Sequence, residues 1–98
     1  MKIRFSEYQV SPEETTIVGL IPRYHVLLHN DSVNTMDFVT GCLIQVFGFT
    51  VEQAWAVMYE AHVKGIALCA TEPLEKAELH CDRLIAFGLH ATIEEAVE

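Results

Sequence analysis

The chain has 98 residues, enough for one small domain with a single core. Hydrophobic residues make up 51% and charged residues 20%, with only 5 Gly and 3 Pro, which argues against long disorder and against low-complexity architecture. The six Lys and Arg against fourteen Asp and Glu give a net charge of −8. This charge disfavours nucleic acid and anionic membranes as partners, and it favours a cationic ligand or a protein with a basic surface.

The first part of the chain differs in pattern from the rest. Residues 1–22 have weak periodicity and carry acidic residues early, without the apolar region of a signal peptide and with too many acids for a transit peptide. We predict that residues 1–22 form a partly disordered N-terminal extension and that residues 23–98 form the core domain.

The strongest local signals begin at Arg23. Residues 23–29 are rich in β-forming residues, and the Asn-Asp-Ser that follows is typical of a turn. Asn34 or Thr35 can cap a helix that Gly48 ends. Within this helix the apolar residues recur at spacings of 3, 4 and 3, at Met36, Val39, Leu43 and Val46.

A second helix is predicted from Thr50 to Gly65. Thr50 and Gln53 have the spacing of a capping box. Its expected inner stripe is Val51, Trp55, Met58 and His62, flanked by Ala54 and Ala61.

Three further elements follow the second helix. Residues 66–71 are short and apolar, which indicates a buried strand, and Pro73 suits the first position of a third helix. Gly88 ends this helix, and residues 90–94 form a last short strand. The expected inner face of the third helix consists of Leu74, Ala77, Cys81, Leu84 and Ile85.

The predicted order is therefore strand, helix, helix, strand, helix, strand. Such an order is typical of an α+β domain, in which a small three-stranded antiparallel sheet packs against three helices.

One group of residues points to ligand binding. If Asn30 and Asp31, which follow the first strand, converge with His62 near the end of the second helix, they form a cluster of hydrogen-bond acceptors suited to an ammonium group. Met36, Val39, Met58 and Ala61 would then wall an apolar cavity beside it. A cation next to such a cavity describes the free α-amino group of a chain with a large hydrophobic first residue. Ordinary turn chemistry for Asn30 and Asp31, and a core position for His62, remain alternatives.

Catalysis and metal binding find less support. The sequence has no GxSxG, P-loop or HExxH motif, and no nucleophile with a base and an orienting group, so we expect no enzyme activity and no cofactor. His25 and His29 share a strand face without a third metal ligand nearby, so no metal site is predicted. The three cysteines Cys42, Cys69 and Cys81 are widely spaced, which favours free buried thiols in a reducing compartment over a disulfide, a zinc site or a thiol enzyme.

Two segments of the sequence resemble a known family. The runs YHVLLHNDSVNTMDFV and AVMYEAHVKGIALCATEPLEKAE are similar to the ClpS adaptor family, with its Asn-Asp, Met-(Asp/Glu)-Phe-Val and His-x-x-Gly elements in the same order. The resemblance covers about residues 23–93. Within it, the motifs LLHND and EAHxxGIAL resemble those of the cyanobacterial and plastid branch of the family.

The resemblance implies a function and a set of site residues. ClpS proteins are adaptors that bind N-degrons, proteins beginning with Leu, Phe, Tyr or Trp, and deliver them to a Clp AAA+ unfoldase of the ClpA or ClpC type partnered with ClpP. It implies a monomer in the cytoplasm, or in the plastid stroma of a plant. It implies that Asn30, Asp31 and His62 bind the α-amino group and that Glu75 and His80 contact the unfoldase. The implied pocket residues are Asn34, Met36, Val39, Met58, Ala61 and Leu89, with Met36 as a gate against β-branched residues.

Several positions depart from the family pattern. Ser32 replaces a second Asp, Asn34 and Thr35 stand where Thr-Pro is usual, Ala61 replaces a common Val, and His80 replaces a Lys. These departures leave open an alternative function, an unfoldase-binding modulator with a degenerate pocket.

Overall fold

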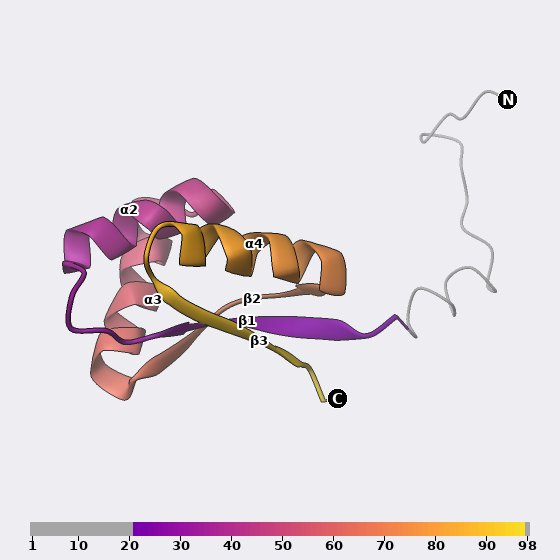
Figure 1. Cartoon of the computed structure of the whole chain (residues 1–98). Helices are drawn as coiled ribbons and strands as arrows, with labels where there is room; N and C mark the ends of the chain where they lie inside the picture. The colour runs from indigo at the N-terminus through magenta and orange to yellow at the C-terminus, as the bar shows by residue number, and fades with distance from the viewer. Residues whose placement is uncertain (1–20, 98) are drawn as a thin grey trace, which may run out of the picture.

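The computed structural model describes residues 21–97 (Figure 1). The elements are β1 (Arg23–His29), α2 (Met36–Phe47), α3 (Val51–Lys64), β2 (Ile66–Pro73), α4 (Leu74–Ala86) and β3 (His90–Glu95). This order confirms the predicted α+β architecture. The prediction of a partly disordered extension falls almost wholly on residues 1–20, which lie outside the described residues.

The three strands form one antiparallel sheet in the order β2-β1-β3, so β1 is the central strand. The pairing of β1 with β2 shifts between Val26, which faces Ala70, and Leu27, which faces Leu68. Figure 1 shows α4 lying along the sheet, with α2 and α3 gathered at the end where β1 leads into α2. The end of β1 is therefore the point at which the sheet and two helices meet.

The core lies between the sheet and the helices. Because successive strand residues point to opposite faces, Val26 and Leu28 of β1 are both buried, while Leu27 between them is partly exposed. From the other elements, the most deeply buried side chains are Leu43, Ala54, Ala67, Ala77 and Leu84.

The helix ends agree with the predicted capping residues. The Oγ1 atom of Thr35 accepts a hydrogen bond from the Phe38 N–H at 3.1 Å, so Thr35 rather than Asn34 caps α2. Thr50 and Gln53 make both bonds of the capping box at the start of α3. Gly48 and Gly65 end α2 and α3 with φ angles of 72° and 90°, in the left-handed region that glycine adopts without strain.

The buried face of α3 differs from the predicted stripe. Ala54, Met58 and Ala61 face the core, whereas Val51 is 64% and Trp55 50% exposed. The small side chains of the two alanines let α3 approach β2 closely. If the predicted stripe with the Trp55 ring faced the core instead, the ring would hold α3 and β2 apart. The prediction that Val51 and Trp55 line the core was wrong, because hydrophobic residues occupy two sides of this helix.

Two further predictions need correction. Leu74 and Ile85 of α4 are 40% and 51% exposed, so its inner face consists of Ala77, Cys81 and Leu84 alone.

The strand predicted at 66–71 is buried on one face only, because Ile66 and Leu68 are about half exposed, and it runs on to Pro73. Pro73 is therefore the residue before α4 rather than its first helical residue. No helix within residues 21–97 has the length and hydropathy needed to cross a membrane.

Candidate functional site

The loop after β1 is tied to the end of α3. The backbone N–H of Asn30 donates to the carbonyl of Gly65 at 3.0 Å, and Gly65 is the residue that ends α3. Since His62 lies in the last turn of α3, this bond brings the Asn30–Asp31 segment and His62 to the same end of the sheet. The convergence rests on a strand end and a helix end that are far apart in sequence.

Asp31 is held by a local network of hydrogen bonds. Its Oδ1 atom accepts from the backbone N–H groups of Val33 at 2.9 Å and Asn34 at 2.8 Å, and its Oδ2 atom accepts from Nδ2 of Asn34 at 3.2 Å. These bonds favour the charged carboxylate. They hold the pKa of Asp31 below its ordinary value of 3.8, chiefly through the backbone N–H of Asn34 and against a smaller opposing effect of burial.

Asn34 connects this loop to another part of the fold. Its Nδ2 atom also donates to the carbonyl of Gly88 at 3.0 Å, in the connection between α4 and β3. The side chain of Asn34 thus bridges the Asp31 carboxylate and the α4–β3 connection, and it fixes the position of the loop in which Asp31 lies.

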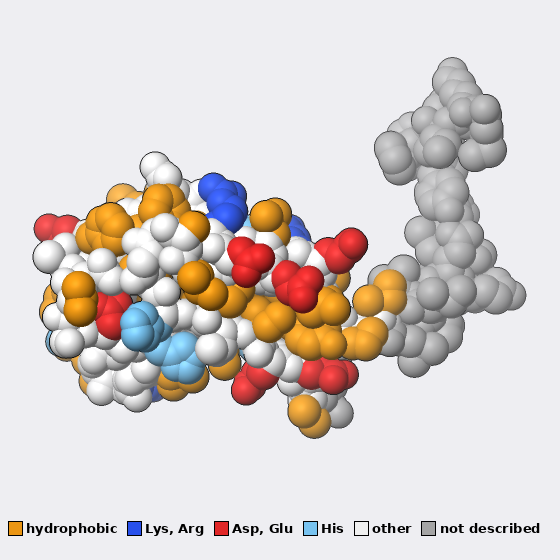
Figure 2. Space-filling model, in the orientation of Figure 1, with side chains coloured by type: hydrophobic (Ala, Val, Ile, Leu, Met, Phe, Trp, Pro, Cys, Tyr) orange, Lys and Arg blue, Asp and Glu red, His pale blue; other side chains and the backbone are white. Residues whose placement is uncertain are grey.

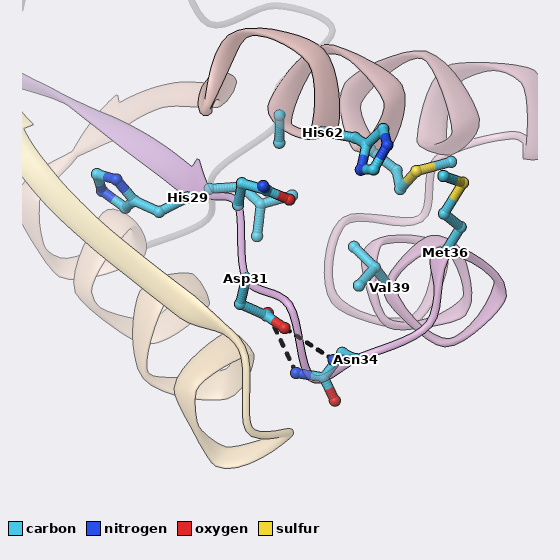
Figure 3. Close-up of a pocket in the computed structure, with 10 residues that line it drawn as sticks. His29, Asp31, Asn34, Met36, Val39 and His62 are labelled. Atoms are coloured by element: carbon cyan, nitrogen blue, oxygen red, sulfur yellow. Dashed lines mark hydrogen bonds between the residues drawn. The ribbon is translucent and has the colours of Figure 1, made fainter.

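A pocket opens between this loop and the two helices α2 and α3 (Figure 3). The empty space in the pocket and at its open mouth, solvent included, amounts to about 340 Å³. Figure 3 shows His62 on one side, Asp31 and Asn34 on another, and Met36 and Val39 between them. The lining residues are Leu28, His29, Asn30, Asp31, Asn34, Met36, Val39, Met58, Ala61 and His62.

The pocket has a polar side and an apolar side. Met58 and Ala61 are buried at its α3 wall, while Met36, 43% exposed, lies at the start of α2. Asp31 uses about three of its four acceptor positions within the loop, which leaves one position and a full negative charge for a ligand. The arrangement can therefore bind a cation and an apolar group that are joined to each other.

Eight of the nine residues predicted for amine binding or for the pocket line this single pocket. Leu89 does not, because its side chain is 3% exposed within the core and borders a separate hollow beside Ile85 and His90. His62 is exposed, which removes the alternative that it is a core histidine.

The two residues predicted to contact an unfoldase lie on α4. Glu75 is exposed in its first turn. His80 is mostly buried, with its side chain 12% exposed, and its Nδ1 atom lies 2.9 Å from Oε1 of Glu72. Its ring meets the Phe47 ring edge-on, with the two ring centroids 4.8 Å apart. His80 therefore joins α4 to β2.

Two pocket residues were missed by the sequence reasoning. Leu28 and His29 both line the pocket because β1 runs up to it. In Figure 3 the His29 ring points away from Asp31 and His62, and its Nε2 atom lies 2.7 Å from Oγ1 of Thr92 on the neighbouring strand. The continuous strand pattern of residues 23–29 gave no signal that its last two residues border a cavity.

The cysteines are buried and unpaired. Burial raises the pKa of Cys69 to about 12, with smaller contributions from Cys81 and Glu72, and it also raises the pKa values of Cys42 and Cys81. Because the thiolate is the nucleophile, these thiols are poorly suited to catalysis at neutral pH. Among residues 21–97, no three His, Cys, Asp or Glu side chains are placed to hold a metal ion.

Comparisons with known proteins agree with the geometry. Residues 21–92 match the family model described as ATP-dependent Clp protease adaptor protein ClpS. The chain is 45% identical over 84 residues to the ATP-dependent Clp protease adapter protein ClpS of Synechococcus elongatus, covering 85% of this chain and 88% of that protein. It is 38% identical over 76 residues to the chloroplastic adapter CLPS1 of Arabidopsis thaliana, covering 76% of this chain and 48% of that protein.

A solved structure shares the fold. Agrobacterium tumefaciens ClpS2 bound to L-phenylalaninamide superposes with a TM-score of 0.73 at 28% identity, over 78% of this chain and 99% of that chain. The family match covers most of the chain, and the element order and the sheet agree. The chain therefore belongs to the ClpS family of Clp protease adaptor proteins.

Proposed function

We propose that this chain binds proteins with a free α-amino group and a large hydrophobic first residue (Leu, Phe, Tyr or Trp) and delivers them to a Clp AAA+ unfoldase with its ClpP protease. The observation that carries the proposal is the pocket that joins Asp31 and His62 to an apolar wall. A family member of similar fold is bound to L-phenylalaninamide, a ligand with a free amine and an aromatic side chain.

The polar side of the pocket suits the α-amino group. Asp31 supplies a negative charge, which its hydrogen bonds favour, while Asn30 can supply a side-chain carbonyl and His62 a ring nitrogen as acceptors. Each charge-assisted bond to the ammonium contributes roughly 1.5–3 kcal/mol before the costs of ordering the peptide. An acetylated terminus has neither the charge nor the donors for these contacts.

The apolar side suits the first side chain. Met36, Val39, Met58 and Ala61 would contact it, and burying a Leu or Phe side chain contributes roughly 1.5–3 kcal/mol. Together with the amine contacts, this supports micromolar or tighter binding. Met36 lies at the mouth, where it would exclude side chains branched at Cβ.

The unfoldase would dock through α4. Glu75 is exposed at the start of that helix and is available for a contact, whereas His80 already pairs with Glu72 and would act mainly by holding α4 in place. We further propose that the partner is of the ClpC type and that the chain acts as a monomer without enzyme activity. The similarity to Clp protease adapters from a cyanobacterium and a chloroplast supports a place in the cytoplasm or the plastid stroma.

A binding assay with matched peptides tests the proposal. Fluorescence anisotropy should show micromolar or tighter binding of a Leu-starting peptide and loss of binding for its acetylated twin and for Asp31→Ala. Equal binding of both peptides would contradict amine capture. Binding of the purified unfoldase without any peptide binding would select the alternative of a modulator with a degenerate pocket.

A further inference from the structure

An aromatic pair lies exposed on α3 beside the pocket. The rings of Trp55 and Tyr59 stack almost parallel, with centroids 4.8 Å apart and planes 9° apart. Trp55 is 50% and Tyr59 46% exposed, so the pair does not serve the core, which α3 meets through Ala54, Met58 and Ala61. We call Trp55 and Tyr59 the aromatic platform.

The platform is continuous with the candidate pocket. Along α3 the order is Trp55, Tyr59, His62, and the centroid of the Tyr59 ring lies 6.5 Å from that of His62. Because His62 also lines the pocket, a ligand that reaches His62 is within reach of Tyr59. An extended peptide advances about 3.3–3.6 Å per residue, so two residues span the distance from His62 to Tyr59.

The two helices that border the pocket, one of which carries the platform, are negatively charged. On α2 and α3 the acidic residues are Asp37, Glu52 and Glu60, against the single basic residue Lys64. Away from the platform, the face in Figure 2, which lies over α4 and β3, also carries Asp and Glu at several places and Lys and Arg mainly at its upper edge. Exposed aromatic faces attract guanidinium and ammonium groups, and Arg stacks on them best.

We propose that the aromatic platform is a second subsite, which binds a basic side chain, preferably Arg, at the second or third position of the substrate. The inference rests on the proposed function, because it places the first residue in the pocket and the α-amino group near His62. The platform then adds sequence preference beyond the first residue. A cation on an exposed aromatic face contributes about 0.5–1 kcal/mol, which corresponds to a twofold to fivefold gain in affinity.

Peptides that differ at one position test the subsite. Affinities would be measured for free-amine peptides beginning Leu-Ala-Ala, Leu-Arg-Ala, Leu-Ala-Arg and Leu-Glu-Ala, against the full chain and its variants Tyr59→Ala, Trp55→Ala and Tyr59→Phe. We expect at least one Arg peptide to bind two to five times more tightly than Leu-Ala-Ala. Tyr59→Ala should remove this gain without changing the Leu-Ala-Ala affinity, and Tyr59→Phe should keep it.

A matched control separates binding of Arg at the platform from attraction of a basic peptide by the net negative charge of the chain. Leu79→Ala replaces a residue that is 55% exposed on α4, far along the chain from the platform, and should leave all four affinities unchanged. If Tyr59→Ala and Trp55→Ala both keep the full Arg preference, the preference comes from net charge and the subsite is disproved. Equal losses for all peptides would also disprove it. If no peptide binds the unmodified chain, the proposed function itself fails, which is a different result.

Discussion

Asn34 holds the carboxylate of Asp31 from two directions, with its backbone N–H 2.8 Å from Oδ1 and its side-chain Nδ2 3.2 Å from Oδ2. The same Nδ2 atom donates to the carbonyl of Gly88. Asn34 therefore lowers the pKa of the proposed amine-binding carboxylate and fixes its position, whereas the family resemblance implied only that Asn34 lines the pocket.

Replacing the side chain of Asn34 should weaken binding of the amine. Asn34→Leu removes both side-chain hydrogen bonds but keeps the backbone bond to Asp31. Only the bond to Asp31 bears directly on the bound amine, and a net contribution of roughly 0.5–1.5 kcal/mol for that bond predicts an affinity for a Leu-starting peptide that is about twofold to twelvefold lower. Val33→Ala, in the same loop at an 85% exposed position, is the control and should bind normally. Unchanged binding by Asn34→Leu would show that the side-chain hydrogen bonds of Asn34 are not needed for binding the amine.

The gate role of Met36 can be read from peptide selectivity. Met36→Ala shortens a side chain at the pocket mouth, so peptides that begin with Val or Ile should gain affinity severalfold while Leu peptides change less. Isothermal titration calorimetry with peptides that begin with Leu, Ile or Val gives the ratio of their affinities for the original chain and for the variant. If the ratio of Leu to Val affinity stays the same in the variant, the selectivity arises elsewhere in the pocket.

Ala61 should set the depth of the pocket. It is buried at the α3 wall, and the two methyl groups added by Ala61→Val would take up space that a large first residue needs. We expect severalfold weaker binding of Trp and Phe peptides and little change for Leu. The melting temperature would be measured beside the affinities, and a uniform loss for all three peptides at unchanged stability would contradict this role.

Much of the fold could be predicted because local signals agreed with tertiary packing. The capping residues Thr50 and Gln53, and the glycines at 48 and 65, act through bonds within a few residues, so the helix ends were found correctly. The inner face of α3 was not predicted correctly. Trp55 and Met58 are both apolar, and only the distance between α3 and β2 decides which of the two is buried.

The candidate site was predictable only in part. The pattern of residue types suggested Asp31 and His62, but their meeting depends on the Asn30–Gly65 backbone bond, which no local pattern reveals. The bond from Asn34 to Gly88 joins residues 54 positions apart. Leu89 points into the core because β3 begins directly after it, and the orientation of that strand is fixed by its pairing with β1.

Lowering the pH tests the role of the Asp31 carboxylate. Hydrogen bonds hold the pKa of Asp31 below its ordinary value of 3.8, chiefly through the backbone N–H of Asn34, so the stability that its charge contributes is complete above 3.8 and is lost as the pH falls through the lowered pKa. The free energy of unfolding should therefore fall more steeply on acidification in the original chain than in Asp31→Asn, as urea titrations at a series of acidic pH values would show. An equal pH dependence of the two proteins would contradict this role.

The buried thiols should be inert in the folded chain. With the pKa of Cys69 at about 12 and those of Cys42 and Cys81 raised, iodoacetamide at pH 7.5 should label the native protein far more slowly than the protein in guanidinium. Mass spectrometry counts the alkyl groups over time. Rapid labelling of one cysteine in the native state would revive the interpretation as a thiol enzyme.

The most direct test of the central claim is an NMR titration of the isotopically labelled chain with L-phenylalaninamide and with its N-acetyl form. The account predicts that the free amine shifts the amide signals of Asn30, Asp31, Met58 and His62, all at the pocket, and that the acetylated form shifts none of them at the same concentration. Shifts that map to another surface, or that are equal for both compounds, would contradict it.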